Sequence, residues 1–196
     1  SFVSDIVLEI FRIGTTRPKL ASLFGNSEDS NIDLPESIPE RKWVSVPRRR
    51  AMMFRDNGNF ERAKSELDEM KRRLEEASDD VERMLSFYHT HWGSLHTRRN
   101  EYEEAIECYR DALDIAQRVE DRHQIGNNLH NIGSMEIKLG RYSEARRHLE
   151  RALEIKDELN DDGDKAAVLN KLGELALKIG EYDAAEEKCT RSLRMS

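Results

Sequence analysis

The sequence predicts an all-α protein, a right-handed α-solenoid built of antiparallel helix hairpins. Two observations predict this fold class. The first is a set of landmark residues that recur every 40 positions, namely Gly93, Gly133 and Gly173, Tyr102, Tyr142 and Tyr182, and Ala105, Ala145 and Ala185. The second is composition, because the 196 residues are 36% charged and only 37% hydrophobic. That balance favours an elongated helical protein over a compact two-layer α/β core.

Each repeat unit is predicted to be a helix, a tight turn and a second helix. The turn position holds Asn100, Gly140 or Gly180, residue types that tolerate the left-handed backbone at a helix end. The small residue before the turn lets the two helices approach closely, and the alanine after the turn faces it. A degenerate earlier copy lies 42 residues upstream, where Ala51, Gly58, Phe60 and Ala63 match Gly93, Asn100, Tyr102 and Ala105.

Start signals place the helices near residues 47–57, 59–77, 80–98, 102–119, 122–139, 142–159, 164–179 and 182–195. Pro47 suits a first helical turn. Asp79 with Glu82, and Asp121 with Gln124, have the spacing of capping boxes. These helices form four predicted repeats at 43–79, 80–121, 122–161 and 162–196, the last of them open-ended.

The repeated segments also carry two short motifs. They are His89-x2-Trp92-Gly93, Leu129-x2-Ile132-Gly133 and Leu169-x2-Leu172-Gly173, followed by Ala105-x3-Tyr109, Ala145-x3-Leu149 and Ala185-x3-Cys189. Over residues 45–196 they resemble the tetratricopeptide repeat (TPR) family. The 40-residue period resembles the long-helix variant found in kinesin light chains, Pins-type adaptors and prokaryotic sensor arms. The resemblance implies a superhelix that binds a protein or peptide partner on its concave face.

The first 42 residues do not match the repeat. Residues 1–25 carry an apolar helical stripe and are predicted to form an N-terminal helical segment that caps the first repeat. They also resemble the start of a helix-turn-helix, but an acidic stretch stands where a recognition helix would follow. Residues 26–42 are predicted to be an extended linker, since residues 26–40 hold five acidic residues, two prolines and no base.

The TPR resemblance implies which side chains line the groove. The predicted peptide-binding residues are Arg48, Arg49, Arg55, His91, Arg98, Asn127, His130, Asn131, Lys138, Asn170, Lys171 and Lys178. The lining holds seven Lys and Arg side chains and two acidic ones, Asp56 and Glu174, although the whole chain has a net charge of −7. A basic groove on an acidic body attracts acidic partners, and asparagine amides can hold a peptide backbone. The alternative is an ordinary solvated face.

We therefore predict a non-catalytic interaction module that binds an extended acidic or phosphorylated peptide. One alternative is the ligand- or peptide-sensing arm of a larger transcriptional or NTPase regulator. Another is a structural spacer or self-association module. Self-association could use the open C-terminal helix or the 26–40 linker, which could also occupy the groove.

Catalytic and cofactor motifs are missing from the sequence. It holds no phosphate loop, dinucleotide turn, HExxH or nucleophile elbow. His89, His91 and His96 lack the i, i+4 spacing of a helical zinc pair, and His89 is expected in the core. We predict no enzyme activity, no metal and no cofactor.

Charge and hydropathy also restrict the surroundings of the chain. The net charge of −7 argues against nucleic acid as a partner. No apolar run reaches the ~18–20 residues of a membrane span, and no signal peptide is visible. Cys108 and Cys189 are expected to be free thiols, so we predict a cytoplasmic protein. Because the chain begins at Ser1, we expect it to be part of a longer one.

Overall fold

The computed structural model describes residues 40–76 and 81–195. Side chains are described from Pro47 onward, apart from the gap at residues 76–80. The chain divides into two compact units, Ser1–Trp43 and Val44–Ser196, and the second unit holds all three glycine landmarks. The predicted helical segment at 1–25 and the predicted linker up to residue 39 lie outside the described residues.

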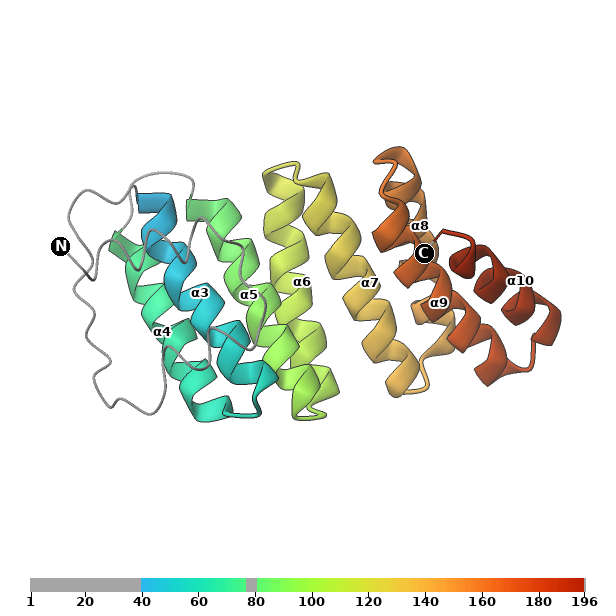
Figure 1. The fold of residues 1–196 in the computed structure, drawn as a ribbon, viewed down its shortest axis with the longest axis horizontal. Helices are drawn as coiled ribbons and strands as arrows, with labels where there is room; N and C mark the ends of the chain where they lie inside the picture. The colour runs from blue at the N-terminus through green and yellow to red at the C-terminus, as the bar shows by residue number, and fades with distance from the viewer. Residues whose placement is uncertain (1–39, 77–80, 196) are drawn as a thin grey trace. The chain divides into compact units, whose positions relative to one another are not determined.

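Eight helices and no strand occur in the described residues, and from α5 onward the hairpins follow one another in chain order across Figure 1. They are α3 (Glu40–Asp56), α4 (Phe60–Glu76), α5 (Val81–Arg98), α6 (Tyr102–Arg118), α7 (Arg122–Lys138), α8 (Tyr142–Glu158), α9 (Asp162–Ile179) and α10 (Tyr182–Leu193). The predicted all-α solenoid is confirmed. From α4 onward every predicted helix boundary lies within two residues of the observed one.

The prediction for the first helix was wrong at its start. Helix α3 begins at Glu40, so Pro47 lies inside the helix and the last residues of the predicted linker are helical. Proline has no N–H to donate to the carbonyl four residues earlier, here that of Trp43. The helix nevertheless continues on both sides of Pro47. Using proline as a start signal therefore placed the boundary too late.

The glycine landmarks lie at a close approach between the two helices of each hairpin, and we call this set of contacts the glycine seam. A Cβ added at Gly93 would lie 2.6 Å from Tyr109, one at Gly133 2.7 Å from Leu149, and one at Gly173 2.7 Å from Cys189. In each case the filling side chain is the last residue of the Ala-x3 motif. The predicted close packing of paired helices is confirmed in all three hairpins.

Two kinds of turn connect the helices. The turns inside the repeats use left-handed residues as predicted, with φ of 61° at Asn100, 74° at Gly140 and 83° at Gly180. The turns between repeats also pass through positive φ, at Glu120 and at Asn160, both with φ of 54°. Asp121 caps α7 as predicted by accepting a hydrogen bond from the Gln124 backbone N–H at 3.1 Å.

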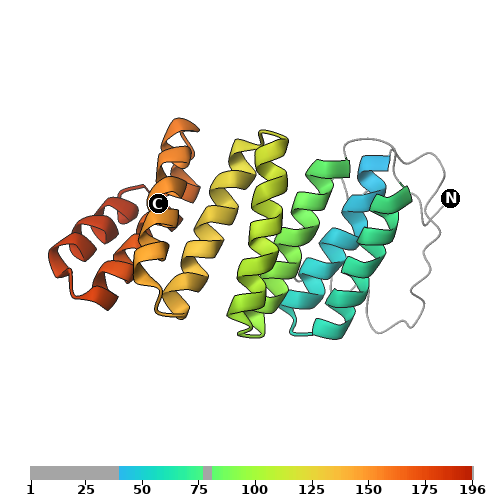
Figure 2. The same cartoon turned by 180° about the vertical axis from the view of Figure 1, so that it is seen from behind.

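From α5 onward, both helices of each hairpin pack on the first helix of the next hairpin. Helix α6 packs on α7 and α8 on α9, while α5 also contacts α7 and α7 also contacts α9. The view from behind shows the same order of hairpins from α5 to α10 (Figure 2). No contact between α6 and α8 or between α8 and α10 appears among the described residues. The odd-numbered helices α5, α7 and α9 therefore contact one another from one hairpin to the next, whereas the even-numbered helices α6, α8 and α10 do not.

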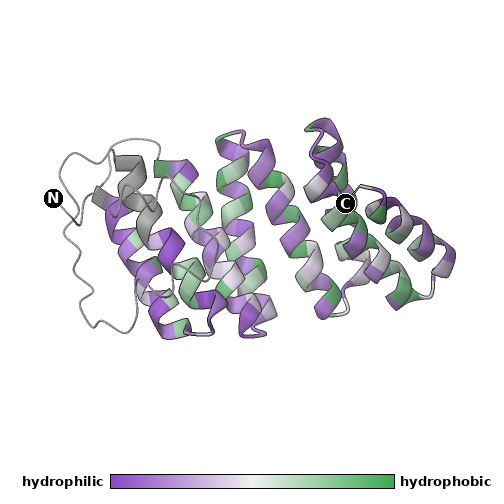
Figure 3. Ribbon diagram, viewed as in Figure 1, coloured by the Kyte–Doolittle hydropathy of each residue, from purple (hydrophilic) through white to green (hydrophobic). Residues whose placement is uncertain are grey.

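Apolar side chains fill the space between the helices in three buried clusters. One joins α3, α4 and α5 around Leu67 and Met70, a second joins α6 to α7 around Tyr109, and a third joins α7, α8 and α9 around Leu149. Hydrophilic residues occur on all eight helices (Figure 3). Hydrophilic residues therefore occur on both the odd and the even helices, and the buried apolar clusters lie between helices.

Candidate peptide-binding face

Twelve residues on the odd-numbered helices occupy predicted groove positions, and we call this set the odd-helix face. Nine of them occupy three rows at 40-residue spacing, His91–Asn131–Lys171, Ser94–Ser134–Glu174 and Arg98–Lys138–Lys178, and α3 adds Arg48, Arg55 and Asp56. One residue in each row comes from each of α5, α7 and α9. Residues 40 positions apart in the sequence thus occupy equivalent positions on successive odd-numbered helices.

Asp56 organises the basic residues at the α3 end of this face. It accepts two hydrogen bonds from Arg55, at 2.8 and 3.1 Å, and one from Arg98 of the next repeat at 3.2 Å. Arg55 also donates from Nη1 to Ser94 Oγ at 2.6 Å. One carboxylate therefore holds two guanidinium groups and connects α3 to α5.

Glu174 does the same between the third and fourth repeats. Its carboxylate accepts a hydrogen bond from Lys171 at 2.8 Å and lies 3.5 Å from the ammonium of Lys138 on α7. The hydrogen bond from Lys171 is the largest influence lowering the pKa of Glu174. The side chain is thus a carboxylate at neutral pH, and it too is shared by two cations.

Arg48 is less available than the sequence predicted. Its guanidinium lies 4.9 Å from the centroid of the Phe87 ring, an arrangement typical of a cation–π contact. Its Nε is buried without a hydrogen-bond partner in the described part of the chain. Burial, and then the charge of Arg49, lower the pKa of Arg48. Arg48 therefore belongs partly to the packing between α3 and α5.

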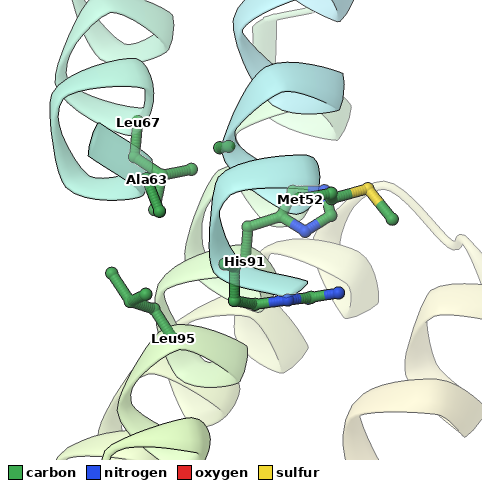
Figure 4. A pocket seen from close by; sticks show the side chains of 7 residues that line it. Met52, Ala63, Leu67, His91 and Leu95 are labelled. Carbon is green, nitrogen blue, oxygen red and sulfur yellow. The ribbon is translucent and has the colours of Figure 1, made fainter. Parts of the chain in front are cut away.

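The side chains of the two predicted groove histidines, His91 and His130, are largely buried. His91 lines a small cavity with Met52 and Arg55 of α3, Ala63 and Leu67 of α4, and Leu95 of its own helix (Figure 4). Burial, together with Arg48 and Arg55, lowers its pKa to about 3. Burial, followed by the charge of Lys171, lowers the pKa of His130 to about 4. Both rings are neutral at pH 7, and both Nε2 atoms are buried without a partner among the described residues.

The predicted amides differ in their availability. Asn127 accepts a hydrogen bond from the ammonium of Lys156 at 2.6 Å, so its carbonyl oxygen is already engaged. Asn131 is half-buried and Asn170 is exposed. Arg49 and Lys178 are also exposed. The predicted groove therefore offers two amides, rather than three, whose oxygens no other described side chain engages.

Sequence reasoning missed Lys156, which lies on α8, outside the helices expected to line the groove. Its side chain is 1% exposed, and its ammonium also pairs with Asp164 and lies 3.6 Å from Asp161. A buried lysine has no characteristic sequence pattern. Only its place four residues after the core position Ala152, on the buried side of α8, could have raised the question.

His89 is partly exposed and lies 3.5 Å from Asp111, so its predicted place in the core is wrong. No group of three His, Cys, Asp or Glu side chains that could hold a metal occurs among the described residues. None of the described helices is long and apolar enough to cross a membrane.

The sequence profile of the tetratricopeptide repeat family matches residues 80–158 and 124–196. The chain therefore belongs to the tetratricopeptide repeat family, as its motifs indicated. Tetratricopeptide repeats are protein-interaction modules, which supports the prediction that this chain binds other proteins. A search of curated proteins found no match.

Solved structures show the same fold. Aspartyl phosphate phosphatase F from Bacillus subtilis aligns with a TM-score of 0.74 at 16% identity, over 81% of this chain and 41% of that one. BtubC from P. vanneervenii aligns with a TM-score of 0.67 at 21% identity, over 80% of this chain and 70% of BtubC. A signal transduction ATPase with a tetratricopeptide repeat sensor from Pyrococcus horikoshii aligns with a TM-score of 0.69 at 16% identity. The alignment covers 82% of this chain and 25% of the ATPase. This chain thus spans about two-fifths of the phosphatase and a quarter of the ATPase.

Proposed function

We propose that the odd-helix face binds an extended acidic peptide, phosphorylated or not, and that the module is non-catalytic. The observation that carries this proposal is an excess of cations on a chain of net charge −7. The predicted groove has seven basic and two acidic side chains, and each acidic one is already shared by two basic ones. The carboxylates on the face therefore leave positive charge uncompensated.

Electrostatics would make this face selective for acidic segments. A basic face on an acidic body steers acidic segments toward itself and repels a second copy of the body. Arg98 lies 3.2 Å from the carboxylate of Asp56, and Lys138 lies 3.5 Å from that of Glu174. These pairs indicate how a carboxylate of the partner would contact the same two cations. Asn131 of this face, and Asn170 next to Lys171 in the chain, would hold the peptide backbone, because each amide supplies a donor and an acceptor.

The test is a charge reversal at two exposed positions of the face. Arg98→Glu with Lys138→Glu should weaken capture of acidic peptides from a synthetic library of acidic, neutral and basic sequences by at least about tenfold, since charge-assisted hydrogen bonds contribute roughly 1.5–3 kcal/mol each. Arg110→Glu with Arg147→Glu is the matched control, because both arginines are exposed on even-numbered helices. Equal loss in both double variants, or no loss in either, would contradict the proposal.

A second candidate function is the sensing arm of a larger regulator. The similarity to an ATPase described as having a tetratricopeptide repeat sensor, only a quarter of which is covered, favours it. In that arrangement the same face would receive the signal. A third candidate, self-association through α10, is favoured by Leu193, which is 77% exposed on that helix. Sedimentation of wild type against Leu193→Ser distinguishes it, because the peptide-binding proposal requires no change of mass.

A further inference from the structure

The row Arg98–Lys138–Lys178 places one cation in the same position of three successive repeats. Arg98 is the last residue of α5, Lys138 is the last residue of α7, and Lys178 is the next to last of α9. All three side chains are exposed. We call this row the cation ladder, and its three positions the rungs.

The distance between rungs is set by helix packing. Helix α5 contacts α7 and α7 contacts α9, and packed helices have axes about 8–10 Å apart. In a polyproline II peptide every third side chain points the same way, and at ~3.1 Å per residue these are about 9 Å apart. In a β-strand, side chains on one face recur every second residue, about 6.6 Å apart. Of these two periods, only the three-residue one falls within the ~8–10 Å expected between packed helices.

Building on the proposed function, we propose that the cation ladder reads an acidic side chain at every third position of a peptide in the polyproline II conformation. The sequence class is acid-x-x-acid-x-x-acid, crossing α5, α7 and α9 in turn. A polyproline II backbone has no internal hydrogen bonds, so it needs partners, and amides such as Asn131 and Asn170 can supply them.

The ladder is partly occupied by the protein's own carboxylates. Asp56 lies 3.2 Å from Arg98, and Glu174 lies 3.5 Å from Lys138, whereas Lys178 has no ion pair with any described residue. A peptide must compete with Asp56 and Glu174 for the first two rungs. Removing either carboxylate should therefore tighten binding, which no purely structural role of these pairs would predict.

Stabilisation of helix ends is the competing explanation of the ladder. Cations in the last turn interact favourably with the negative end of the helix dipole, and Arg98, Lys138 and Lys178 all lie in last turns. That role concerns each helix separately. It predicts no dependence of peptide affinity on the spacing of acidic residues, so spacing is the quantity to measure.

The experiment uses the full chain and three labelled ten-residue peptides of identical composition. Each carries three glutamates among prolines and alanines, placed at every second, every third or every fourth position. Fluorescence anisotropy at low salt should give the three-residue spacing an affinity about fivefold or more above the others, since one well-placed exposed ion pair contributes up to about 1 kcal/mol. Equal affinities would overturn the ladder while leaving the proposed function standing. Failure of all three peptides and of the acidic library peptides would overturn both.

Two variants make the test specific to the middle rung. Lys138→Gln should abolish the preference for three-residue spacing, and Glu174→Gln should strengthen binding of that peptide. Arg147→Gln, an exposed arginine on α8, is the control and should change neither. If Lys138→Gln weakens all three peptides by the same factor, the ladder is wrong. If Glu174→Gln leaves affinity unchanged, Glu174 does not compete for the rung, and the proposed ladder is wrong in its second position.

Discussion

The glycine seam and the odd-helix face share one period and use it in opposite ways. At the seam the same residue type recurs in Gly93, Gly133 and Gly173, and each faces a side chain that fills the same space. On the face, a single row changes from His91 to Asn131 to Lys171. The repetition specifies the packing of the hairpins, and the departures from it specify what the surface can bind. Four experiments test this distinction.

The largest effect is expected at the seam. Gly133→Leu puts a large side chain where a Cβ alone would lie 2.7 Å from Leu149 and 3.2 Å from the Ala145 carbonyl oxygen. Overpacking costs typically 1–3 kcal/mol, and we expect the upper end, about 3 kcal/mol by urea unfolding. Gly163→Ala is the matched control, because a Cβ there meets nothing within 4 Å. It should be neutral or stabilising, and similar losses in both variants would contradict the seam.

Lys156 tests whether the packing of the helices and the predicted groove are coupled, because this buried side chain of α8 reaches the predicted groove residue Asn127. Lys156→Ala removes a buried cation that serves Asn127, Asp161 and Asp164. Breaking a buried pair costs about 3–5 kcal/mol, but Asp164 is partly exposed and can be solvated, so we expect about 2 kcal/mol. The exposed Lys178→Ala should lose less than about 0.5 kcal/mol. An equal, small loss in both would show that Lys156 does not join the two regions.

The buried histidines make the stability of the face depend on pH. In the unfolded chain a histidine titrates near ~6.5, whereas burial holds the pKa of His91 at about 3 and that of His130 at about 4 in the folded chain. Between those values the unfolded state binds protons that the folded state does not. The free energy of unfolding should therefore fall as pH drops from about 6.5 toward 4, by about 1 kcal/mol per histidine by pH 5.5.

Thermal unfolding between pH 7 and 5.5 checks this expectation. The double variant His91→Gln, His130→Gln should show a much flatter dependence than wild type, because its side chains at those positions do not titrate. A slope equal to that of wild type would mean that the two rings are accessible to solvent and belong to the open face.

The smallest effect is expected at a turn between repeats. Glu120 has φ of 54°, a left-handed conformation that costs a non-glycine residue about 1–2 kcal/mol. Glu120→Gly should relieve that cost, less the entropy that glycine loses on folding, for a net gain of about 0.5 kcal/mol. Glu107→Gly, at an exposed position inside α6, should instead destabilise. A loss at both sites would show that Glu120 makes contacts that outweigh its backbone cost.

The parts of the structure that can be predicted from the sequence are those that the repeat encodes. The close approach of the paired helices at Gly93, and the left-handed turn at Asn100, come directly from residues that recur at fixed spacing. The residue that fills the space at Gly93 was not predicted, because the sequence indicated Ala105 and the structure has Tyr109 there. The start of helix α3 could not be predicted, because Pro47 is compatible with both a first turn and a helix interior, and only tertiary context decides. The depth of His91 depends on how closely Met52 and Arg55 of another helix cover it. No local pattern contains that information.

The positions of the basic residues in the groove could be predicted from the sequence, but the ion pairs that each of them makes could not. The positions of Arg98, Lys138 and Lys178 come from the repeat register. Their engagement with Asp56 and Glu174 does not, because it depends on side chains that bridge consecutive repeats. Whether Asn127 is available for a partner depends on Lys156, a residue 29 positions away. Equivalent positions in successive repeats can be identified from the sequence alone. Side-chain contacts between one repeat and the next can be identified only in the packed structure.

The side chain that packs on the glycine becomes smaller from one hairpin to the next, from Tyr109 to Leu149 to Cys189. Tyr109 is 3% exposed and its hydroxyl lies 3.1 Å from Thr97 Oγ1, whereas Cys189 is half-buried and α10 contacts α9 alone among the described helices. In a stack where each unit packs only on its neighbours, opening free energies vary from unit to unit. Amide protons of α10 should exchange with deuterium well before those of α6, so the module opens from one hairpin instead of melting as a block.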